Sequence, residues 1–236
     1  QPGECNDGVD NNADGKIDFP NDPGCSSSSD ATENTVCPGA NCPVCSNTTD
    51  DDTDTQIDYP ADFGCSSAAG STEVFCSVEP NVAMTPISAP TTNGDLSVMA
   101  DNYDQTCQSN TGNDMAFALQ LPVPVASLVI DTELSTVSDT VISLKDAACG
   151  VQLGCDDDGS TGPTTGLLSV LSVANVPAGN YAIQVDSYST SNNGAFTLRV
   201  KGTVATMTSC TSPLFTSGVL VCPTGTTCTG TPARCQ

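Results

Sequence analysis

The residues best suited to chemistry are carboxylates and amides that alternate along one short stretch of the chain. Asp10, Asn12 and Asp14 stand at alternate positions, and Gly15 follows them. A Ca²⁺ ion takes roughly six to eight oxygen ligands at about 2.3–2.6 Å, and a loop supplies them when alternate side chains turn toward one point. Glycine permits the sharp turn that such a loop needs. This spacing therefore predicts a calcium-binding loop.

A second stretch repeats the first at an offset of 40 residues, so that Cys45–Cys65 matches Cys5–Cys25. Identical residues stand at positions 5, 10, 14, 17, 18, 20, 22, 24, 25, 26, 27, 32 and 33 of the first repeat and 40 positions later. An acidic, solvated linker is the alternative interpretation. The duplication keeps the ligand positions and changes the residues between them, which favours a metal site.

Each repeat supplies a similar set of predicted ligands. In the first repeat these are the side chains of Asp10, Asn12, Asp14, Asp18 and Asp22 and the backbone carbonyl of Lys16; in the second they are the side chains of Asp50, Asp52, Asp54, Asp58 and Asp62 and the backbone carbonyl of Gln56. The second repeat has Thr55 where Gly is expected, so its turn should differ in shape. Neither repeat has the Glu that closes an EF-hand loop, and Asp22 and Asp62 are the predicted replacements.

The residues around the loops point to a known kind of repeat. Cys, Pro and Gly flank both loops, as in the wording DGVDNNADGKIDFPNDPGC. The two stretches resemble the thrombospondin type 3 and dockerin-like calcium repeats found in secreted bacterial surface proteins of myxobacterial type. The resemblance implies Ca²⁺ as the cofactor and a structural role for the ion.

The composition predicts an extracellular location. Among 236 residues there are 14 cysteines, 4% aromatic residues and no Trp, so we expect small cores stapled by disulfides in an oxidising compartment. The net charge of −23 makes nucleic acid and anionic membranes poor partners. No apolar run reaches the roughly 20 residues of a membrane-spanning helix. The chain starts with Gln1 and Pro2 rather than Met, so we expect a mature chain whose signal peptide has been removed.

The repeat also predicts part of the disulfide framework. Cys5 should pair with Cys25 and Cys45 with Cys65, and Cys149 and Cys155 flank a short turn and should pair. Elimination then suggests the pairs Cys37–Cys42 and Cys76–Cys107. The four remaining cysteines, Cys210, Cys222, Cys228 and Cys235, allow three connectivities, between which the sequence does not choose.

From about residue 80 the sequence changes to short apolar or alternating runs separated by Gly, Asn, Asp and Pro. The runs are Asp95–Ala100, Met115–Leu121, Ser127–Leu134, Thr140–Lys145, Leu167–Val173, Tyr181–Ser187 and Ala195–Val200. Such runs predict an antiparallel β-sandwich, and no segment shows a helical period. We therefore expect a mainly β chain: a calcium-loop repeat at 1–40, a second at 41–79, a jelly-roll-like sandwich at 80–205 and a small Cys-rich module at 206–236.

Residues 90–202 resemble the bacterial pre-peptidase C-terminal domain. The resemblance depends on GDLSVMADNYDQTC, MAFALQLPV, DTVISL, the CDDDG turn at 155–159 and VPAGNYAIQVDSYSTSNNGAFTLRV. It implies a non-catalytic sandwich that binds calcium, matrix or polysaccharide. Asp156, Asp157 and Asp158 are candidate ligands of a further calcium site, with Asp101 or Asp104 as additional members; a solvated turn is the alternative.

The sequence argues against an enzyme. It contains no His for a Ser or Cys nucleophile, no nucleotide-binding motif and no Trp platform for a glycosidase. Two extracellular roles remain. The first is the repeating subunit of a surface filament, a homopolymer that could join through edge strands. The second is a calcium-dependent adhesin that binds glycan or matrix, for which Tyr103, Tyr181 or Tyr188 would line a concave face.

Glycosylation is a separate hypothesis. Asn47 begins the only N-x-S/T sequence in the chain, and the tracts Ser26–Ser29 and Thr224–Thr231 could carry O-linked sugar.

Overall fold

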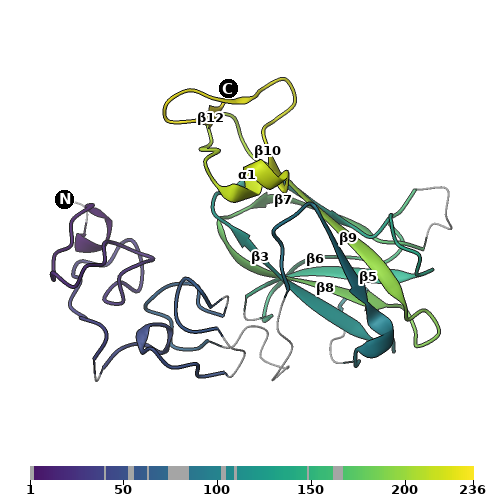
Figure 1. The fold of residues 1–236 in the computed structure, drawn as a ribbon, viewed down its shortest axis with the longest axis horizontal. Coiled ribbons are helices and arrows are strands. Elements are labelled where there is room, and N and C mark those ends of the chain that lie inside the picture. The colour runs from purple at the N-terminus through teal and green to yellow at the C-terminus, as the bar shows by residue number, and fades with distance from the viewer. Residues whose placement is uncertain are drawn as a thin grey trace. The chain divides into compact units, whose positions relative to one another are not determined.

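The computed structural model describes residues 3–39, 41–52, 56–62, 64–73, 85–101, 105–108, 111–147, 149–161 and 167–236. These residues fall into two compact units, one within 1–83 and 147–149 and the other within 84–146 and 150–236. The first unit contains the two repeats and the second contains the β-sheets (Figure 1). None of the helices in the described ranges is long and apolar enough to cross a membrane.

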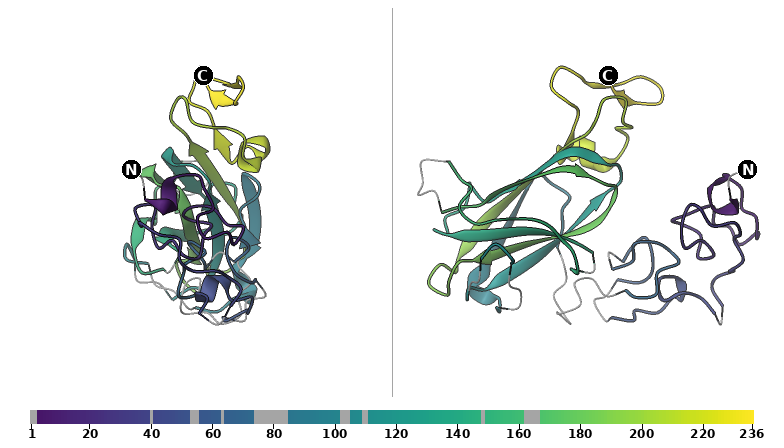
Figure 2. Two further views of the ribbon diagram at one scale, coloured as in Figure 1. Left: turned by 90° about the vertical axis from the view of Figure 1, so that its left-hand side faces the viewer. Right: turned by 180° about the vertical axis from the view of Figure 1, so that it is seen from behind.

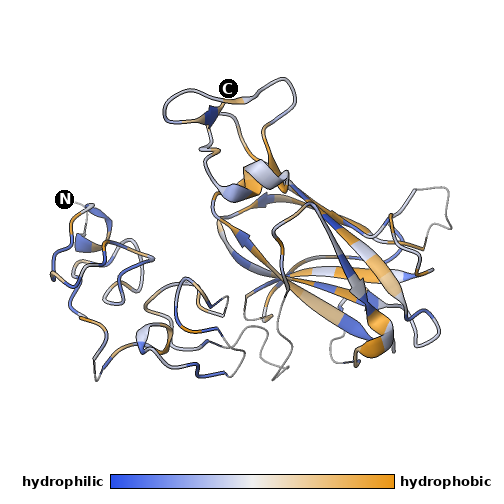
Figure 3. Cartoon of the chain, in the orientation of Figure 1, coloured by the Kyte–Doolittle hydropathy of each residue, from blue (hydrophilic) through white to orange (hydrophobic). Residues whose placement is uncertain are grey.

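The repeat unit consists of loops, turns and two 3₁₀ helices, Glu4–Asn6 and Val44–Ser46. Figure 3 shows this unit mostly in hydrophilic colours, whereas hydrophobic residues are concentrated along the strands of the other unit. The centre of each repeat is a disulfide, Cys5–Cys25 in the first and Cys45–Cys65 in the second, and all four cysteines are fully buried. Cross-links therefore replace a hydrophobic core in this part of the chain.

The duplicated sequence folds into a duplicated backbone. The N–H of Phe19 donates to the carbonyl of Cys5 at 3.2 Å, and the N–H of Tyr59 donates to that of Cys45 at 3.0 Å. The backbone of Asp18 has φ 55° and that of Asp58 also has φ 55°, the left-handed region that Asp tolerates better than most residues. The repeats thus share hydrogen bonds as well as sequence.

The second unit is a β-sandwich. Its elements are β1 (Thr85–Pro86), β2 (Thr91–Asp95), a 3₁₀ helix (Leu96–Val98), β3 (Asp114–Leu121), β4 (Val125–Asp131), β5 (Thr140–Asp146), β6 (Gln152–Asp156), β7 (Val170–Val176), β8 (Gly179–Ser187), β9 (Ala195–Thr203), α1 (Pro213–Ser217), β10 (Leu220–Val221), β11 (Cys228–Thr229) and β12 (Arg234–Cys235). One large sheet has the order β1-β3-β8-β5-β6 and the other large sheet the order β10-β9-β4-β7, with β2 also paired to β9. Strands β11 and β12 form a separate two-stranded sheet. Figure 1 and Figure 2 show the two sheets as facing layers.

The core lies between these two sheets. In β9 the alternating residues Phe196, Leu198 and Val200 are buried, as the period of two predicts. The ring of Phe196 meets that of Phe117 from β3 edge to face, with centroids 5.9 Å apart. This contact joins the two layers, because β3 and β9 belong to different sheets.

The predicted fold class is confirmed, and most of the predicted strands are present. Two details are wrong. The run Asp95–Ala100 contains a 3₁₀ helix instead of a strand, because the carboxylate of Asp95 accepts the N–H of Ser97 at 2.9 Å and caps a helical turn. A short helix, α1, also exists at Pro213–Ser217, where the sequence showed no helical period.

The disulfides agree with the sequence in three cases and differ in two. Cys5–Cys25, Cys45–Cys65 and Cys37–Cys42 are paired as predicted. The predicted pairs Cys149–Cys155 and Cys76–Cys107 are wrong, because Cys155 is bonded to Cys107. Residues 105–108 lie beside β6, where the N–H of Thr106 donates to the side chain of Gln152 at 3.3 Å, and the Cα atoms of Cys107 and Cys155 are 5.9 Å apart. Cys149 is also disulfide-bonded, and Cys76 lies outside the described residues.

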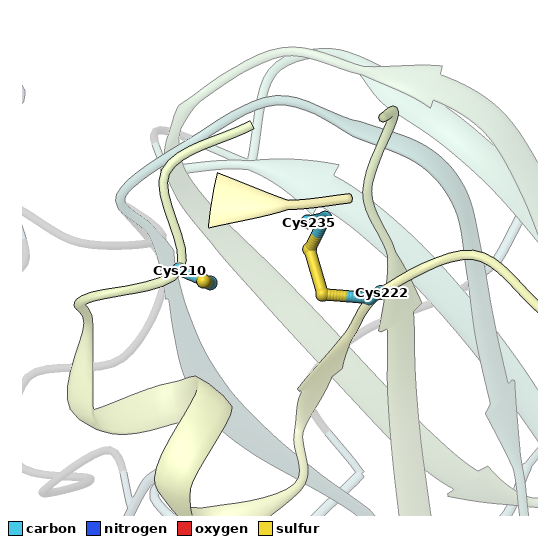
Figure 4. A group of neighbouring side chains, drawn as sticks. All are labelled: Cys210, Cys222 and Cys235. Atoms are coloured by element: carbon cyan, nitrogen blue, oxygen red, sulfur yellow. A yellow bond between two sulfur atoms is a disulfide. The ribbon is translucent and has the colours of Figure 1, made fainter. Parts of the chain in front are cut away.

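The C-terminal segment is attached to the sandwich core. Strand β10 pairs with β9, and Val219 and Leu220 belong to the same hydrophobic cluster as the sandwich residues. Its cysteines form the pairs Cys210–Cys228 and Cys222–Cys235, one of the three open connectivities. Figure 4 shows Cys210 beside the Cys222–Cys235 bridge. These sulfurs lie close enough to hold a metal, but as disulfides they have no thiolate to offer.

Candidate metal centres

The first repeat wraps its backbone around three of the predicted ligands. The two carboxylate oxygens of Asp10 accept the N–H groups of Asp14 at 3.2 Å and of Gly15 at 2.9 Å. The side-chain oxygen of Asn12 accepts the N–H of Asp14 at 3.0 Å. Gly15 has φ 89°, so the turn needs a residue that tolerates the left-handed region. The N–H of Lys16 donates to Oδ1 of Asp14 at 2.8 Å, so backbone N–H groups hold all three side chains.

A buried glutamate closes the loop from the other side. Glu33 is only 1% exposed, and its two oxygens accept the N–H groups of Asn11 at 2.7 Å and of Asp18 at 2.9 Å. Glu33 was not among the predicted ligands. Its identity with Glu73, 40 positions on, was the signal in the sequence that could have found it.

Asp22 completes a group of four carboxylates in the first repeat. Its Oδ1 accepts the N–H of Gly24 at 2.6 Å, whereas its Oδ2 is buried without a hydrogen-bond partner. Burial raises the pKa of Asp22. The negative charges of Asp14, Glu33 and Asp10 raise that pKa further, although the bond from Gly24 opposes them. Asp14, Glu33 and Asp10 are therefore close enough to Asp22 to act on its carboxylate.

The oxygens left over in this group have the chemistry of a cation site. The Oδ2 atom of Asp14 is buried without a hydrogen-bond partner, as is that of Asp22. A buried carboxylate oxygen is costly unless a proton, a hydrogen bond or a cation compensates it. The all-oxygen donor set, rich in carboxylates, fits Ca²⁺.

The second repeat builds the same arrangement around Glu73. Glu73 is 1% exposed and accepts the N–H groups of Asp51 at 2.7 Å and of Asp58 at 3.0 Å. Oxygens of Asp50, Asp52 and Glu73 lie within 4.8 Å of one another. Burial raises the pKa of Glu73, and the charges of Asp51 and Asp58 raise it further, against the two hydrogen bonds.

Asp62 occupies the place of Asp22 in the second repeat. Its carboxylate accepts the N–H of Gly64 at 2.6 Å, and one of its oxygens lies within 4.8 Å of Glu73. Cys65 shares this group, but its sulfur is bonded to Cys45. The predicted ligand Asp54 and the neighbouring Thr55 lie outside the described residues.

One further predicted ligand in each repeat, Asp18 or Asp58, binds backbone N–H groups near the start of its loop. Both oxygens of Asp18 accept backbone N–H groups, from Asp7 at 3.0 Å and Gly8 at 2.9 Å. Asp58 does the same with Asn47 at 3.0 Å and Thr48 at 2.8 Å. The structure therefore gives these carboxylates a hydrogen-bonding role, and a direct contact of either with a metal stays a prediction. The same holds for the carbonyls of Lys16 and Gln56.

One hydrogen bond between side chains occurs in both repeats, but the donor and the acceptor residues stand at swapped positions. In the first repeat the amide of Asn11 donates to Asp7 at 3.2 Å; in the second the amide of Asn47 donates to Asp51 at 2.6 Å. Positions 7 and 11 thus correspond to 47 and 51 with amide and carboxylate swapped. The hydrogen bond is retained although both residues differ. Glycosylation of Asn47, whose side chain makes this bond, stays a prediction.

The three acids of the CDDDG turn separate into two groups. Asp156 Oδ2 accepts the N–H groups of Gly159 at 2.9 Å and Val170 at 2.7 Å, so Asp156 holds the turn. Asp157 and Asp158 instead lie with Asp139, which the sequence analysis did not select. Of the additional members suggested for this site, Asp101 is exposed and outside this group, and Asp104 lies outside the described residues.

No known protein family matches the sequence, and no curated protein matches it. Among solved structures, the chain is similar to the pre-peptidase C-terminal domain of a collagenase from Bacillus anthracis, with 13% sequence identity, a TM-score of 0.34, and coverage of 52% of this chain and 98% of that domain. A likeness this low supports no conclusion about activity or ligands.

Proposed function

We propose that this chain is an extracellular structural protein whose two N-terminal repeats each bind one calcium ion. The observation that carries the proposal is the duplicated cradle around Glu33 and Glu73. Each glutamate is buried, accepts two backbone N–H groups from its own loop and lies among further carboxylates. Clustered carboxylates repel one another, so a bound Ca²⁺ would stabilise the folded repeat in proportion to its concentration.

The disulfides support the extracellular location. Six bridges join twelve of the cysteines within the described residues, and such density is typical of oxidising compartments. We also propose a non-catalytic role, because the described residues of the repeats offer hydrogen-bonded carboxylates and disulfides but no activated nucleophile.

We propose further that the chain polymerises into a surface filament. Strand β7 is an edge strand of the sheet β10-β9-β4-β7, in which it pairs with β4 along one of its two edges. The strand is seven residues long, and such an edge can accept a strand from a second copy. This supports a homopolymer joined through sandwiches.

A calcium-dependent adhesin is the second candidate. A pocket of about 170 Å³ lies between the repeats and is lined in part by Lys16, Ser46 and Tyr59. Ligand pockets for small molecules are typically about 300–1,000 Å³, so this one suits only a small group. Tyr181, proposed for a glycan-binding face, is 7% exposed and donates to the carbonyl of Pro177 at 2.9 Å. Tyr188 is 41% exposed and stays available for such a face, whereas Tyr103 lies outside the described residues. The adhesin therefore stays an alternative to the filament.

Calcium binding is tested by counting the ions bound at saturation. The wild-type chain and the double variant Glu33→Gln/Glu73→Gln are dialysed against radioactive calcium. The proposal predicts two fewer bound ions per chain in the variant. Equal counts would show that the cradles are not calcium sites.

Polymerisation is tested by negative-stain electron microscopy of the full chain in calcium and in EGTA. Filaments in calcium are expected. Discrete particles in both buffers would reject the filament and favour the adhesin.

A further inference from the structure

Three acids gather at one end of the sandwich. Asp139 precedes β5, and Asp157 and Asp158 follow β6. These strands pair antiparallel with Ile142 opposite Asp156, so the start of β5 lies beside the end of β6. An oxygen from each acid lies within 4.8 Å of the others.

The acid at the centre of this group is buried and has an unsatisfied oxygen. Asp139 is 9% exposed, and its Oδ1 is buried without a hydrogen-bond partner. The Oδ1 of Asp157 is also buried without a partner, while its Oδ2 accepts the amide of Gln108 at 3.3 Å. Two carboxylates that each have an unpartnered buried oxygen thus lie in one group, which is unfavourable unless a cation compensates their charge.

We propose that Asp139, Asp157 and Asp158 bind a third divalent cation, Ca²⁺, at this end of the sandwich. The group offers only oxygen, and the chain has no His, so the donors suit a hard cation rather than zinc. Asp158 is exposed, which leaves one side of the ion for water.

The surrounding structure holds the acids in place. The disulfide Cys107–Cys155 fixes the strand just before the turn, next to Gln108. Asp156 clamps the turn through two backbone N–H groups, and the hydroxyl of Ser169 donates to the carbonyl of Asp157 at 2.9 Å. Rigid positioning of ligands before the ion arrives favours binding.

A glycine in the turn adds to this rigidity. A Cβ on Gly159 would lie 2.4 Å from Asp156 Oδ2, so no larger residue fits beside the clamp. Ser169 also lies within hydrogen-bonding distance of the hydroxyl of Thr140, at 3.2 Å, next to Asp139 in the chain. The two segments that carry the ligands are thus tied to each other through Ser169.

The negative charges of this group act on Asp139. Burial raises the pKa of Asp139 to about 6, with further contributions from Asp157 and then Asp158.

The proposal does not depend on the repeats, because all three ligands belong to the sandwich unit. The test compares the full wild-type chain with Asp139→Asn and with a matched control, Asp146→Asn. Asp146 ends the same strand, and its Oδ1 accepts the N–H groups of Gly150 at 2.8 Å and Val151 at 3.1 Å, which an Asn oxygen can also accept.

The first measurement is the number of calcium ions bound per chain at saturation. Asp139→Asn should bind one ion fewer than wild type, and Asp146→Asn should bind the same number. An unchanged count for Asp139→Asn would overturn the proposal. Failure of the repeat sites would instead appear as an unchanged count for Glu33→Gln/Glu73→Gln, so the two failures are distinguishable.

A second measurement needs no variant. Calcium is added to the decalcified wild-type chain, and the backbone amide resonances are followed by NMR. The amides of residues 139 and 157–159 should shift with added calcium and not with the same concentration of magnesium. Resonances of these residues that stay unchanged at saturating calcium would overturn the proposal.

Discussion

Replacing Glu33 with Gln removes one negative charge and one acceptor from the first repeat without changing the size of the side chain. The two oxygens of Glu33 accept the N–H groups of Asn11 at 2.7 Å and Asp18 at 2.9 Å, and a Gln can accept only one of them. A hydrogen bond to a charged group contributes about 1.5–3 kcal/mol, so we expect the variant to lose about 2 kcal/mol of local stability from this bond.

Calcium should add a second loss. At a free calcium concentration 100 times the Kd, a bound ion stabilises the folded repeat by about 2.7 kcal/mol, and a disabled site forfeits this stabilisation. The expected total in calcium is therefore about 4–5 kcal/mol. In EGTA the loss should be at most about 2 kcal/mol, because removing one charge also relieves repulsion among the remaining acids.

The assay is native-state hydrogen exchange of the full chain, read at the amides of residues 3–39. A site-resolved method is needed because the chain has two units, and their unfolding need not be one transition. Asp7→Asn is the matched control, since the second repeat already has Asn47 at this place. A loss for Glu33→Gln that is the same in calcium and in EGTA would refute the reasoning and leave Glu33 with a hydrogen-bonding role alone.

Three further predictions concern other parts of the chain. Changing Cys107 and Cys155 together to Ser removes a disulfide that spans 48 residues. In the chain-entropy model this should lower the free energy of unfolding of the sandwich by about 4 kcal/mol. Urea denaturation followed by a signal of tertiary structure measures the change, and a decrease of less than about 1 kcal/mol would contradict the prediction. Replacing Arg199 with Met removes the 2.8 Å ion pair of Asp131, whose side chain is only 4% exposed. The free energy of unfolding should fall by about 1–2 kcal/mol, a value that allows for the partial exposure of Arg199. The double variant with Asp131→Asn should recover part of this stability, and no recovery would argue against the ion pair. Hydrogen bonds from the hydroxyl and the N–H of Ser26 lower the pKa of Asp30 below its ordinary value of 3.8. The stability that Asp30 contributes is therefore present above pH 3.8 and is lost as the pH falls through the lowered, folded-state pKa. Asp30→Asn should weaken this acid dependence of hydrogen exchange in residues 26–30, and a pH profile identical to that of the wild type would contradict the prediction.

The sequence predicted the parts of the fold that follow from local patterns. The alternation in Ala195–Val200 gave the buried face of β9, and the 40-residue duplication gave two equivalent loops and their disulfides. Both signals are local or repeated, so they survive without knowledge of tertiary contacts. Even the short helix α1 has local signals, namely Ser212 as cap, Pro213 at the first position and Gly218 at the end.

What the sequence did not predict depends on contacts between distant segments. The Cys107–Cys155 bridge requires β6 to lie beside residues 105–108, and the grouping of Asp139 with Asp157 requires the pairing of β5 with β6. Tyr181–Ser187 was expected to alternate between a buried and an exposed face, yet Gln184 and Asp186 on the other face of β8 are fully buried, and β8 lies between β3 and β5 in the sheet. Strand order decided these features, and a single sequence does not specify it.

The central claim is that the carboxylates of the two repeats are held together by calcium. The most direct measurement is a crystal structure of the full chain grown in calcium, with anomalous scattering used to locate the ion. The account predicts one calcium peak in each repeat, in the first within about 2.3–2.6 Å of Asp14 Oδ2 and Asp22 Oδ2. Cradles that hold only water at millimolar calcium would contradict it.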